Sequence, residues 1–169
     1  MLKLFLLRHA KSDWQSFDGD DFSRDILQKG IDKTKKIGEY IKKENLKISK
    51  ILCSPSVRTK KTKDIILEYL FKKPLIDYYT CIYHDSDENL LDLLKLQKDV
   101  ESVMIIGHEP KLSNLVYCLS NDYESEHFKC AVGKFVTSGL FSLSFNTDNW
   151  EKISSKNSKI NFYIKPNKL

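Results

Sequence analysis

The stretch that decides the fold is Leu2–His9, which reads LKLFLLRH: a nearly continuous apolar run that ends in an arginine and a histidine. Such a run is typical of a strand buried on both faces of a sheet. Ile48–Cys53 predicts a second, short strand, and the apolar run Val103–Ile106 predicts the clearest strand of all. Because segments with helical spacing lie between these runs, the sequence predicts an α/β fold with a mainly parallel central sheet.

The remaining elements follow from periodicity and from turn residues. Helices are expected over about Asp25–Glu44, around Ile65–Leu70, from about Asp87 to Gln97 and along Leu112–Leu119. A strand is expected at Tyr79–Tyr83, and alternating apolar residues predict two late strands near a sheet edge, at Phe141–Phe145 and Ile160–Ile164. No repeat or linker divides the chain, so we expect one domain over residues 1–169, a three-layer sandwich with helices on both faces of the sheet.

Composition excludes several classes of protein. The apolar runs are far shorter than a membrane span, so no membrane partner is expected. Four scattered cysteines without a C-x-x-C pair favour neither structural zinc nor disulfides, and a reducing cytoplasm is the default location. The 28 basic residues against 23 acidic ones give a charge of +5. Most are lysines on helix-like segments, which is typical of a solvated face and disfavours nucleic-acid binding.

Arginine is scarce, and its positions are informative. Arginine occurs only at Arg8, Arg24 and Arg58, which leaves 28 − 3 = 25 lysines for general solubility. A position that keeps arginine therefore favours a need for a rigid, permanently charged fork of donors. Arg24 lies beside several aspartates, and a local ion pair is its plainer interpretation.

Three strand ends carry the residues with chemical potential. Arg8 and His9 follow the first strand, Ser54–Arg58 follows the second, and His108 follows the strand at Val103–Ile106. In such folds ligands bind beyond the carboxyl ends of the strands. Two guanidiniums and two imidazoles in one crevice suit a phosphate dianion, and a neutral imidazole there can attack phosphorus without a metal. Each residue alone has an ordinary alternative as a loop, core or surface side chain, and the joint pattern carries the prediction.

Other chemistries fit the sequence less well. Cys53 and Arg58 stand one residue too close for the C-x5-R loop of cysteine phosphatases, which makes Cys53 a buried strand-end thiol. Leu112 occupies the place of the second histidine that H-E-x-x-H requires. No Walker loop or G-x-G-x-x-G motif occurs, and the spacing of the histidines does not recommend a metal site. We therefore predict no cofactor and no metal.

Several motifs in order resemble a known family. The stretch Leu6–Trp14, with Arg8-His9-Ala10-Lys11-Ser12, resembles the opening signature of the histidine phosphatase (phosphoglycerate mutase-like) superfamily, and its Ala-Lys-Ser-x-Trp continuation resembles the branch of SixA-type phosphohistidine phosphatases. The similarity extends over essentially the whole chain, through the blocks Asp21–Gly30, Cys53–Thr62, Ile106–Pro110, Phe135–Gly139, Trp150 and Pro166–Leu169. The resemblance assigns Phe135–Gly139, Trp150 and the Pro166–Leu169 ending to the closing strands of the family.

The resemblance implies a phosphoglycerate mutase-like fold and a role for each matching position. His9 would be the transiently phosphorylated nucleophile, and Arg8, Arg58 and His108 would bind the phosphoryl group. Arg24 becomes a candidate for the pocket rim, and Ser12 is a second candidate for substrate binding. The proton donor has no decisive match, because the stretch after the third strand offers four titratable candidates: His84, Asp85, Asp87 and Glu88. The alternative for the acidic residues is that they cap the leucine-rich helix.

The sequence thus predicts a metal-independent phosphatase that acts through phospho-His9 on phosphohistidine in a partner protein, as a monomer or weak dimer. Phosphohistidine is favoured over phosphate esters because its nitrogen leaving group is protonated more readily than an alkoxide. The compact chain also offers no long insertion to cover a small metabolite. Two alternatives stay open: a broad small-molecule phosphomonoesterase, and a non-catalytic phosphate or phosphoprotein binder.

Overall fold

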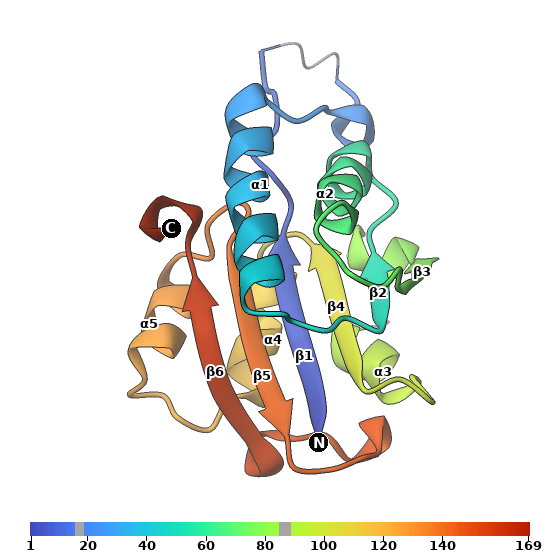
Figure 1. Cartoon of the computed structure of the whole chain (residues 1–169), viewed down its shortest axis with the longest axis vertical. Helices are drawn as coiled ribbons and strands as arrows, with labels where there is room; N and C mark the ends of the chain where they lie inside the picture. The colour runs from blue at the N-terminus through green and yellow to red at the C-terminus, as the bar shows by residue number, and fades with distance from the viewer. Residues whose placement is uncertain (16–18, 85–88) are drawn as a thin grey trace.

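A six-stranded sheet forms the centre of the molecule. The computed structural model describes residues 1–15, 19–84 and 89–169. The strand order is β3-β2-β4-β1-β5-β6 (Figure 1). The first four strands of the chain run parallel, whereas β5 is antiparallel to both of its neighbours. The strands span Leu2–Arg8 (β1), Lys50–Cys53 (β2), Leu75–Tyr78 (β3), Ser102–Gly107 (β4), Leu140–Phe145 (β5) and Ser158–Ile164 (β6).

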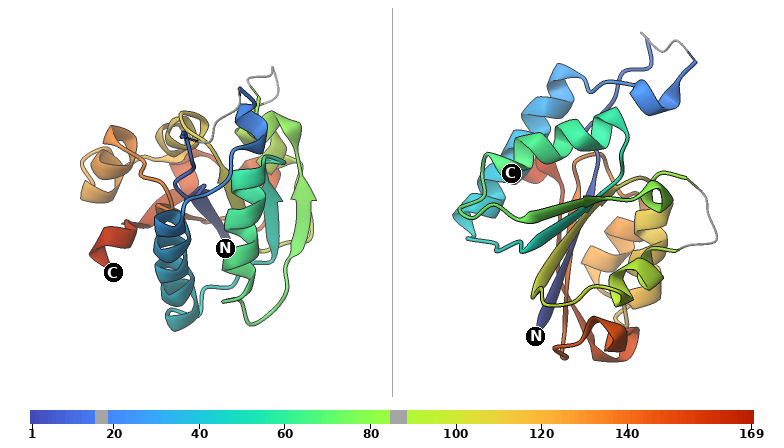
Figure 2. Two further views of the ribbon diagram at one scale, coloured as in Figure 1. Left: turned by 90° about the horizontal axis from the view of Figure 1, so that it is seen from above. Right: turned by 90° about the vertical axis from the view of Figure 1, so that its right-hand side faces the viewer.

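Helices cover both faces of the sheet, as the two views of Figure 2 show. Helices α1 and α2 lie on one face, and their apolar side chains pack with sheet residues such as Phe5 and Met104. Helices α3, α4 and α5 lie on the other face, against residues such as Leu4 and Ile105. The predicted three-layer α/β fold is therefore confirmed. The helices span Gln28–Lys43 (α1), Val57–Leu67 (α2), Leu90–Lys95 (α3), Lys111–Leu119 (α4) and Glu126–Gly133 (α5).

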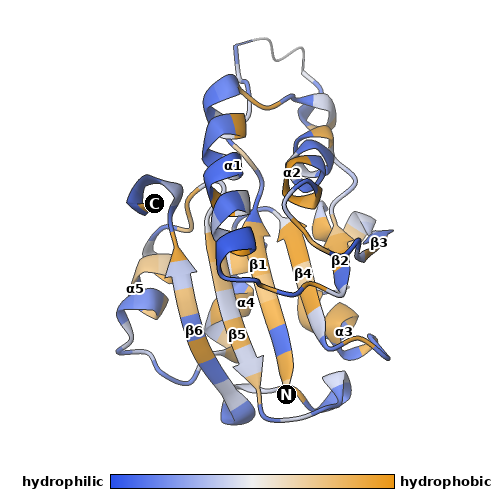
Figure 3. Cartoon of the chain, viewed as in Figure 1, coloured by the Kyte–Doolittle hydropathy of each residue, from blue (hydrophilic) through white to orange (hydrophobic). Residues whose placement is uncertain are grey.

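Burial on two faces explains why the central strands are apolar along their whole length. Every residue of β4 is buried, and β1 is buried except at Lys3 and at its end, Arg8. Figure 3 shows hydrophobic residues along these strands and hydrophilic residues on the outer surface of α1. No helix among the described residues is both long and apolar enough to cross a membrane.

The predicted strand at Tyr79–Tyr83 is wrong. The strand is Leu75–Tyr78, and a short 3-10 helix follows at Thr80–Ile82. The register explains the difference: β3 pairs with β2, and Tyr78 lies opposite Cys53, the last residue of β2. The Tyr79 N–H still donates to the Cys53 carbonyl, but β2 ends at Cys53, and the chain turns into the 3-10 helix after Tyr79.

The first helix begins later than its periodicity suggests. α1 starts at Gln28 instead of Asp25, because the preceding residues are tied in extended form to the loop after β1. Ile26 forms an isolated bridge with Ser12, and the Asp13 N–H donates to the Asp25 carbonyl. A Cβ on Gly30 would stand 2.7 Å from the Lys11 carbonyl oxygen, so this glycine allows the helix to approach that loop.

Other boundaries also differ from the sequence predictions. The leucine-rich helix is shorter than Asp87–Gln97: it begins after Asn89, whose side chain caps it by accepting from the Asp92 N–H, and Asp87 lies outside the described residues. α5 was not predicted. Three blocks that the resemblance assigned to closing strands are not strands. Phe135–Gly139 is the loop between α5 and β5, Trp150 lies in a 3-10 helix at Trp150–Lys152, and the Pro166–Leu169 ending forms a 3-10 helix at Pro166–Lys168 after β6. Both late strands are confirmed, with β6 at the sheet edge.

Candidate active site

The carboxyl ends of three adjacent strands bring the predicted residues together. Arg8 ends β1, His108 follows β4, and Arg58 lies in the first turn of α2 just after β2. Since β2, β4 and β1 are neighbours in the sheet, their carboxyl ends lie next to one another, at the top of the sheet in Figure 1, and this brings the three residues together. The rings of His9 and His108 lie 5.1 Å apart between their centres. The geometric part of the prediction therefore holds, while the chemical roles of the residues stay predictions.

His9 is held as a neutral imidazole with a defined tautomer. Its Nδ1 lies 2.7 Å from the Ala10 carbonyl oxygen, which can only accept, so Nδ1 carries the proton and Nε2 keeps its lone pair. Burial lowers the pKa of His9 to about 3, and the charges of Arg58, Arg8 and Arg24 act in the same direction. The ring is 6% exposed. These features suit a nucleophile at neutral pH.

The backbone around His9 is fixed from several sides. The His9 N–H donates to the Gly107 carbonyl, and the Ser138 N–H lies within reach of the carbonyls of Arg8 and His9. The Ala10 N–H donates to Thr62 Oγ1 on α2. β1, β4 and the segments before β5 and in α2 thus jointly position the histidine.

Two arginines each have a buried donor without a partner among residues 1–15, 19–84 and 89–169. Arg8 Nη1 donates to the Phe135 carbonyl at 2.8 Å, and Arg58 Nη1 donates to the Asp21 carbonyl at 2.8 Å. The Nε–H groups of both arginines are buried without a hydrogen-bond partner. Buried donors of this kind are rare because they cost free energy, and two charged ones in one site fit an anion bound between them.

Asp21 is a site residue that the sequence did not single out as such. Its carboxylate accepts from Arg24 Nε at 3.0 Å, from Arg58 Nη2 at 3.1 Å and from the Tyr83 hydroxyl at 2.8 Å. Partial burial alone would raise the pKa of Asp21, but the hydrogen bonds from Tyr83, Arg24 and Arg58 outweigh it and lower the pKa to about 2. Only its position three residues before Arg24 hinted at the pairing.

His108 is also neutral and is linked to Arg58. Because a guanidinium only donates, His108 Nδ1 accepts from Arg58 Nη2 at 3.3 Å. His108 Nε2 therefore carries the proton and donates to Ser54 Oγ at 2.8 Å. Burial lowers the pKa of His108 to about 3, and the charge of Arg58 acts in the same direction. In this arrangement both ring nitrogens face protein groups.

Arg24 combines the two interpretations that the sequence allowed. It pairs with Asp21, and it also lines a cleft of about 440 Å³ above His9. Its guanidinium stacks on Trp14 with Cζ 3.5 Å from the ring centre, and Nη1 donates to Ser12 Oγ. Ser12 thus lies in the cleft wall and holds Arg24 in place.

Most of the candidates for the proton donor cannot be placed in the site. Asp85, Asp87 and Glu88 lie outside the described residues. His84 is exposed, and its ring packs edge-on against Tyr83 at 4.5 Å, outside the cleft lining. Cys53 is a fully buried thiol whose pKa is raised by burial to about 12, which confirms its assignment as a buried strand-end thiol. No cluster of three metal-ligating side chains occurs among residues 1–15, 19–84 and 89–169.

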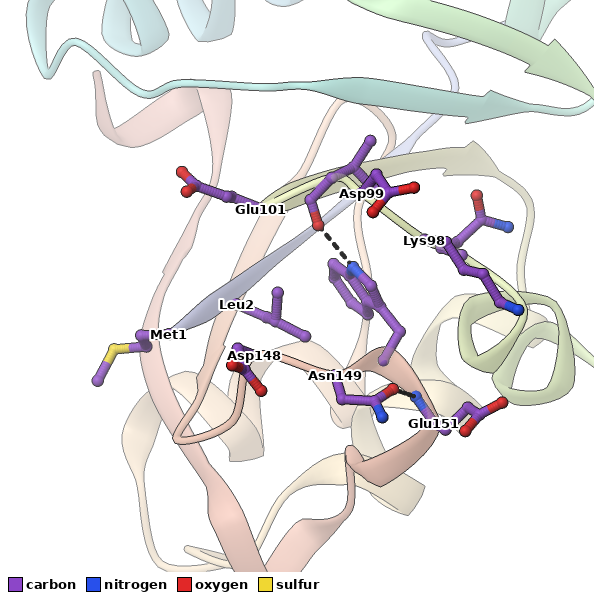
Figure 4. Close-up of a pocket in the computed structure, with 11 residues that line it drawn as sticks. Met1, Leu2, Lys98, Asp99, Glu101, Asp148, Asn149 and Glu151 are labelled. Carbon is purple, nitrogen blue, oxygen red and sulfur yellow. Dashed lines mark hydrogen bonds between the residues drawn. The ribbon is translucent and has the colours of Figure 1, made fainter.

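A second hollow lies at the opposite end of the parallel strands, around the start of β1. This groove of about 810 Å³ surrounds Trp150, whose Nε1 donates to the Val100 carbonyl at 2.8 Å (Figure 4). None of the predicted site residues that the structure describes lines it. The carboxylates around it are Asp99, Glu101, Asp148 and Glu151.

Residues 4–77 match the sequence model of the histidine phosphatase superfamily (branch 1). The chain carries the signature of this superfamily. The matched segment includes His9 and all three arginines of the site, whereas His108 lies beyond it. The match confirms the family resemblance. A curated relative, the uncharacterized protein ML1117 of Mycobacterium leprae, is 23% identical over 159 residues, which cover 91% of this chain and 96% of the relative.

Several solved phosphatase structures share the fold. A candidate phosphohistidine phosphatase SixA from Agrobacterium tumefaciens is 24% identical, with a TM-score of 0.80 and 98% of both chains covered. The protein histidine phosphatase SixA solved with tungstate is 20% identical, with a TM-score of 0.72 and 99% of both chains covered. Phosphoserine phosphatase from Entamoeba histolytica is 15% identical, with a TM-score of 0.62 and 96% of both chains covered.

Proposed function

We propose that the protein is a phosphatase that hydrolyses phosphohistidine on a partner protein, with His9 transiently phosphorylated. The observation that carries the proposal is the pair of buried, unpartnered guanidinium Nε–H groups of Arg8 and Arg58 beside a neutral histidine with a free Nε2 lone pair. Donors from the end of β1 and the first turn of α2 fit the oxygens of a phosphoryl group, and the lone pair fits attack on its phosphorus.

The reaction then proceeds in two displacements. The Nε2 lone pair of His9 forms a bond to phosphorus while the P–N bond of the substrate breaks, and the leaving imidazole nitrogen takes a proton from water. Water next attacks the phosphorus of phospho-His9, the second P–N bond breaks, and phosphate leaves. Arg8 and Arg58 stabilise the charge on the phosphoryl oxygens in both steps. His108 orients Arg58 through its Nδ1.

The protonation state of Asp21, a carboxyl group at the site, argues for a nitrogen leaving group. Asp21 bonds directly to Arg24 and Arg58, but with a pKa of about 2 it is ionised at neutral pH and has no proton to give. An alkoxide leaving group needs a proton donor, whereas an imidazole can take a proton from solvent. Relatives in the same fold are described as acting on phosphohistidine or on phosphoserine, so the choice of substrate rests on this chemistry.

A labelling experiment tests the covalent step. Protein mixed with a ³²P-phosphohistidine peptide and quenched in alkaline detergent should carry label that is stable in base and lost in acid. His9→Ala should carry none. His127→Ala is the matched control, because His127 is an exposed histidine on α5 outside the cleft, and it should label like the wild type. A wild-type protein without label would refute the covalent mechanism.

Substrate comparison separates the phosphatase alternatives. We expect kcat/KM for a phosphohistidine peptide to exceed that for phosphoserine and p-nitrophenyl phosphate. The reverse order would favour a small-molecule phosphomonoesterase. Phosphate binding with no turnover of any of the three would favour a non-catalytic binder.

A further inference from the structure

Four lysines surround the cleft above His9, and they come from four separate parts of the chain. Lys11 follows β1, Lys33 lies in α1, Lys134 follows α5, and Lys165 follows β6. The residues of the cleft lining that the structure describes include no aspartate or glutamate. We call these four side chains the lysine ring.

The lysine ring has no internal counter-charge. Within residues 1–15, 19–84 and 89–169, none of its members forms an ion pair. The crowding affects Lys11, whose pKa is lowered mainly by Lys29 and also by Lys33 and Lys134. Like charges held together cost free energy, and binding an anion relieves that cost.

The rest of the surface distributes its charges differently. Four carboxylates line the groove at the opposite edge of the sheet, together with a single lysine, Lys98. Lysines elsewhere do pair, as Lys61 does with Asp25 and Lys129 with Glu124. The sequence interpretation of the lysines as a uniformly solvated face is therefore too simple at the cleft.

We propose that the lysine ring docks an acidic protein surface, so that the preferred phosphohistidine is one flanked by aspartate and glutamate side chains. This proposal rests on the phosphatase activity proposed above and names its partner by charge. A lone phosphoryl group is already served by Arg8 and Arg58, which leaves the four lysines for further negative charges. Trp14, 64% exposed in the same cleft wall, adds apolar contact area for a polypeptide.

The lysine ring should act on association more than on chemistry. Its charges lie at the cleft border and not on the nucleophile, so they raise the rate of productive encounter with an acidic partner. Such steering is weakened by salt, because exposed charges are screened over about 8 Å at physiological ionic strength. The expected signature is a salt-dependent KM with a nearly constant kcat.

Two phosphohistidine peptides of equal length test the proposal. One carries Asp and Glu on both sides of the phosphohistidine, and the other carries Asn and Gln at the same positions. At low salt the wild type should show about tenfold higher kcat/KM for the acidic peptide, within the range of electrostatic steering. The ratio should fall toward one in about 0.5 M NaCl, where the Debye length is only a few ångströms.

A variant with Lys→Gln at all four ring positions should lose this preference and keep its kcat for phosphoimidazole, a small substrate. The matched control is Lys→Gln at four exposed lysines away from the cleft: Lys42, Lys43, Lys72 and Lys73. Equal turnover of the two peptides by the wild type, or an unchanged ratio in the ring variant, would overturn the proposal. The proposal would also be overturned if the ring lysines made the protein prefer tripolyphosphate while it did not discriminate between the two peptides. The ligand of the ring would then be a small polyanion.

The two proposals fail in different ways. If the protein is not a phosphohistidine phosphatase, neither peptide nor phosphoimidazole is turned over and no label appears on His9. If only the docking proposal is wrong, His9 is labelled and both peptides are turned over equally well, whatever the charge of their flanking residues.

Discussion

The cleft above His9 and the groove around Trp150 lie at opposite ends of the same sheet, and they differ in how their buried polar groups are satisfied. The groove is the larger, at about 810 Å³ against about 440 Å³. Its buried indole N–H is paired with the Val100 carbonyl, and its four carboxylates are exposed to solvent. At the other end, Arg8 and His9 line the cleft, and the candidate site to which they belong also includes Arg58 and His108. This site has two buried guanidinium donors without partners among the described residues and two neutral histidines. Volume is therefore a poor guide to function here, and unsatisfied buried charge is a better one.

The largest expected effect is at the groove, on stability alone. Trp150→Ala should lower the free energy of unfolding by about 4 kcal/mol, the usual cost of removing a buried aromatic side chain. Trp150 is 2% exposed and packs against Phe145. Urea unfolding measures the loss, while kcat/KM at a temperature where the variant is folded should match the wild type. A selective loss of activity in folded protein would remove the contrast between the two regions.

At the cleft, Arg58→Lys should impair activity and spare stability. A lysine keeps the charge but cannot make both Nη bonds, to Asp21 and to His108, or present a donor in the place of Nε. We expect kcat/KM to fall about 100-fold, or about 2.7 kcal/mol of transition-state stabilisation. Lys60→Arg, an exposed change on the same helix, is the control and should stay within twofold of the wild type. Near-normal turnover by Arg58→Lys would show that the guanidinium geometry is dispensable.

The neutral histidines should make the protein less stable in acid. The pKa of each is about 3 in the folded state against about 6.5 when unfolded, so below pH 6.5 the unfolded chain binds more protons. Stability therefore falls as pH drops, by about 2 kcal/mol per histidine between pH 7.5 and pH 5.

Urea unfolding at both pH values measures this effect, and His9→Ala should remove the share of one histidine. Nitrogen NMR of the imidazoles provides a direct check. Titration of both rings near pH 6.5 would contradict the structure.

The central part of the fold and the inner site could be predicted because their signals are local. Continuous apolar runs mark β1 and β4, and Arg8, His9 and His108 stand next to them in sequence. The strand at Tyr79–Tyr83 was misplaced because the end of β3 is set by where β2 stops, which is a property of another strand. Asp21 was missed for a similar reason, since two of its partners, Arg58 and Tyr83, are 37 and 62 residues away.

The lysine ring illustrates the same limit at the surface. Its members stand at positions 11, 33, 134 and 165. A window of 25 residues therefore contains at most two of them. Three of the four follow the ends of strands or helices, so only the completed layers bring them together. Composition alone therefore assigned them to general solubility.

The position of β4 has a consequence for how the protein acquires its site. Residues 4–77 contain β1 and β2 and most of the site, yet these two strands do not touch, because β4 lies between them. Leu7 pairs with Ile106 across almost 100 residues of intervening chain. His9 and Arg58 can therefore meet only after this long loop has closed, an entropic cost that slows folding. During refolding, the return of phosphoryl transfer should coincide with the last large change in sheet structure, and enzymatic turnover would then serve as a clock for completion of the fold.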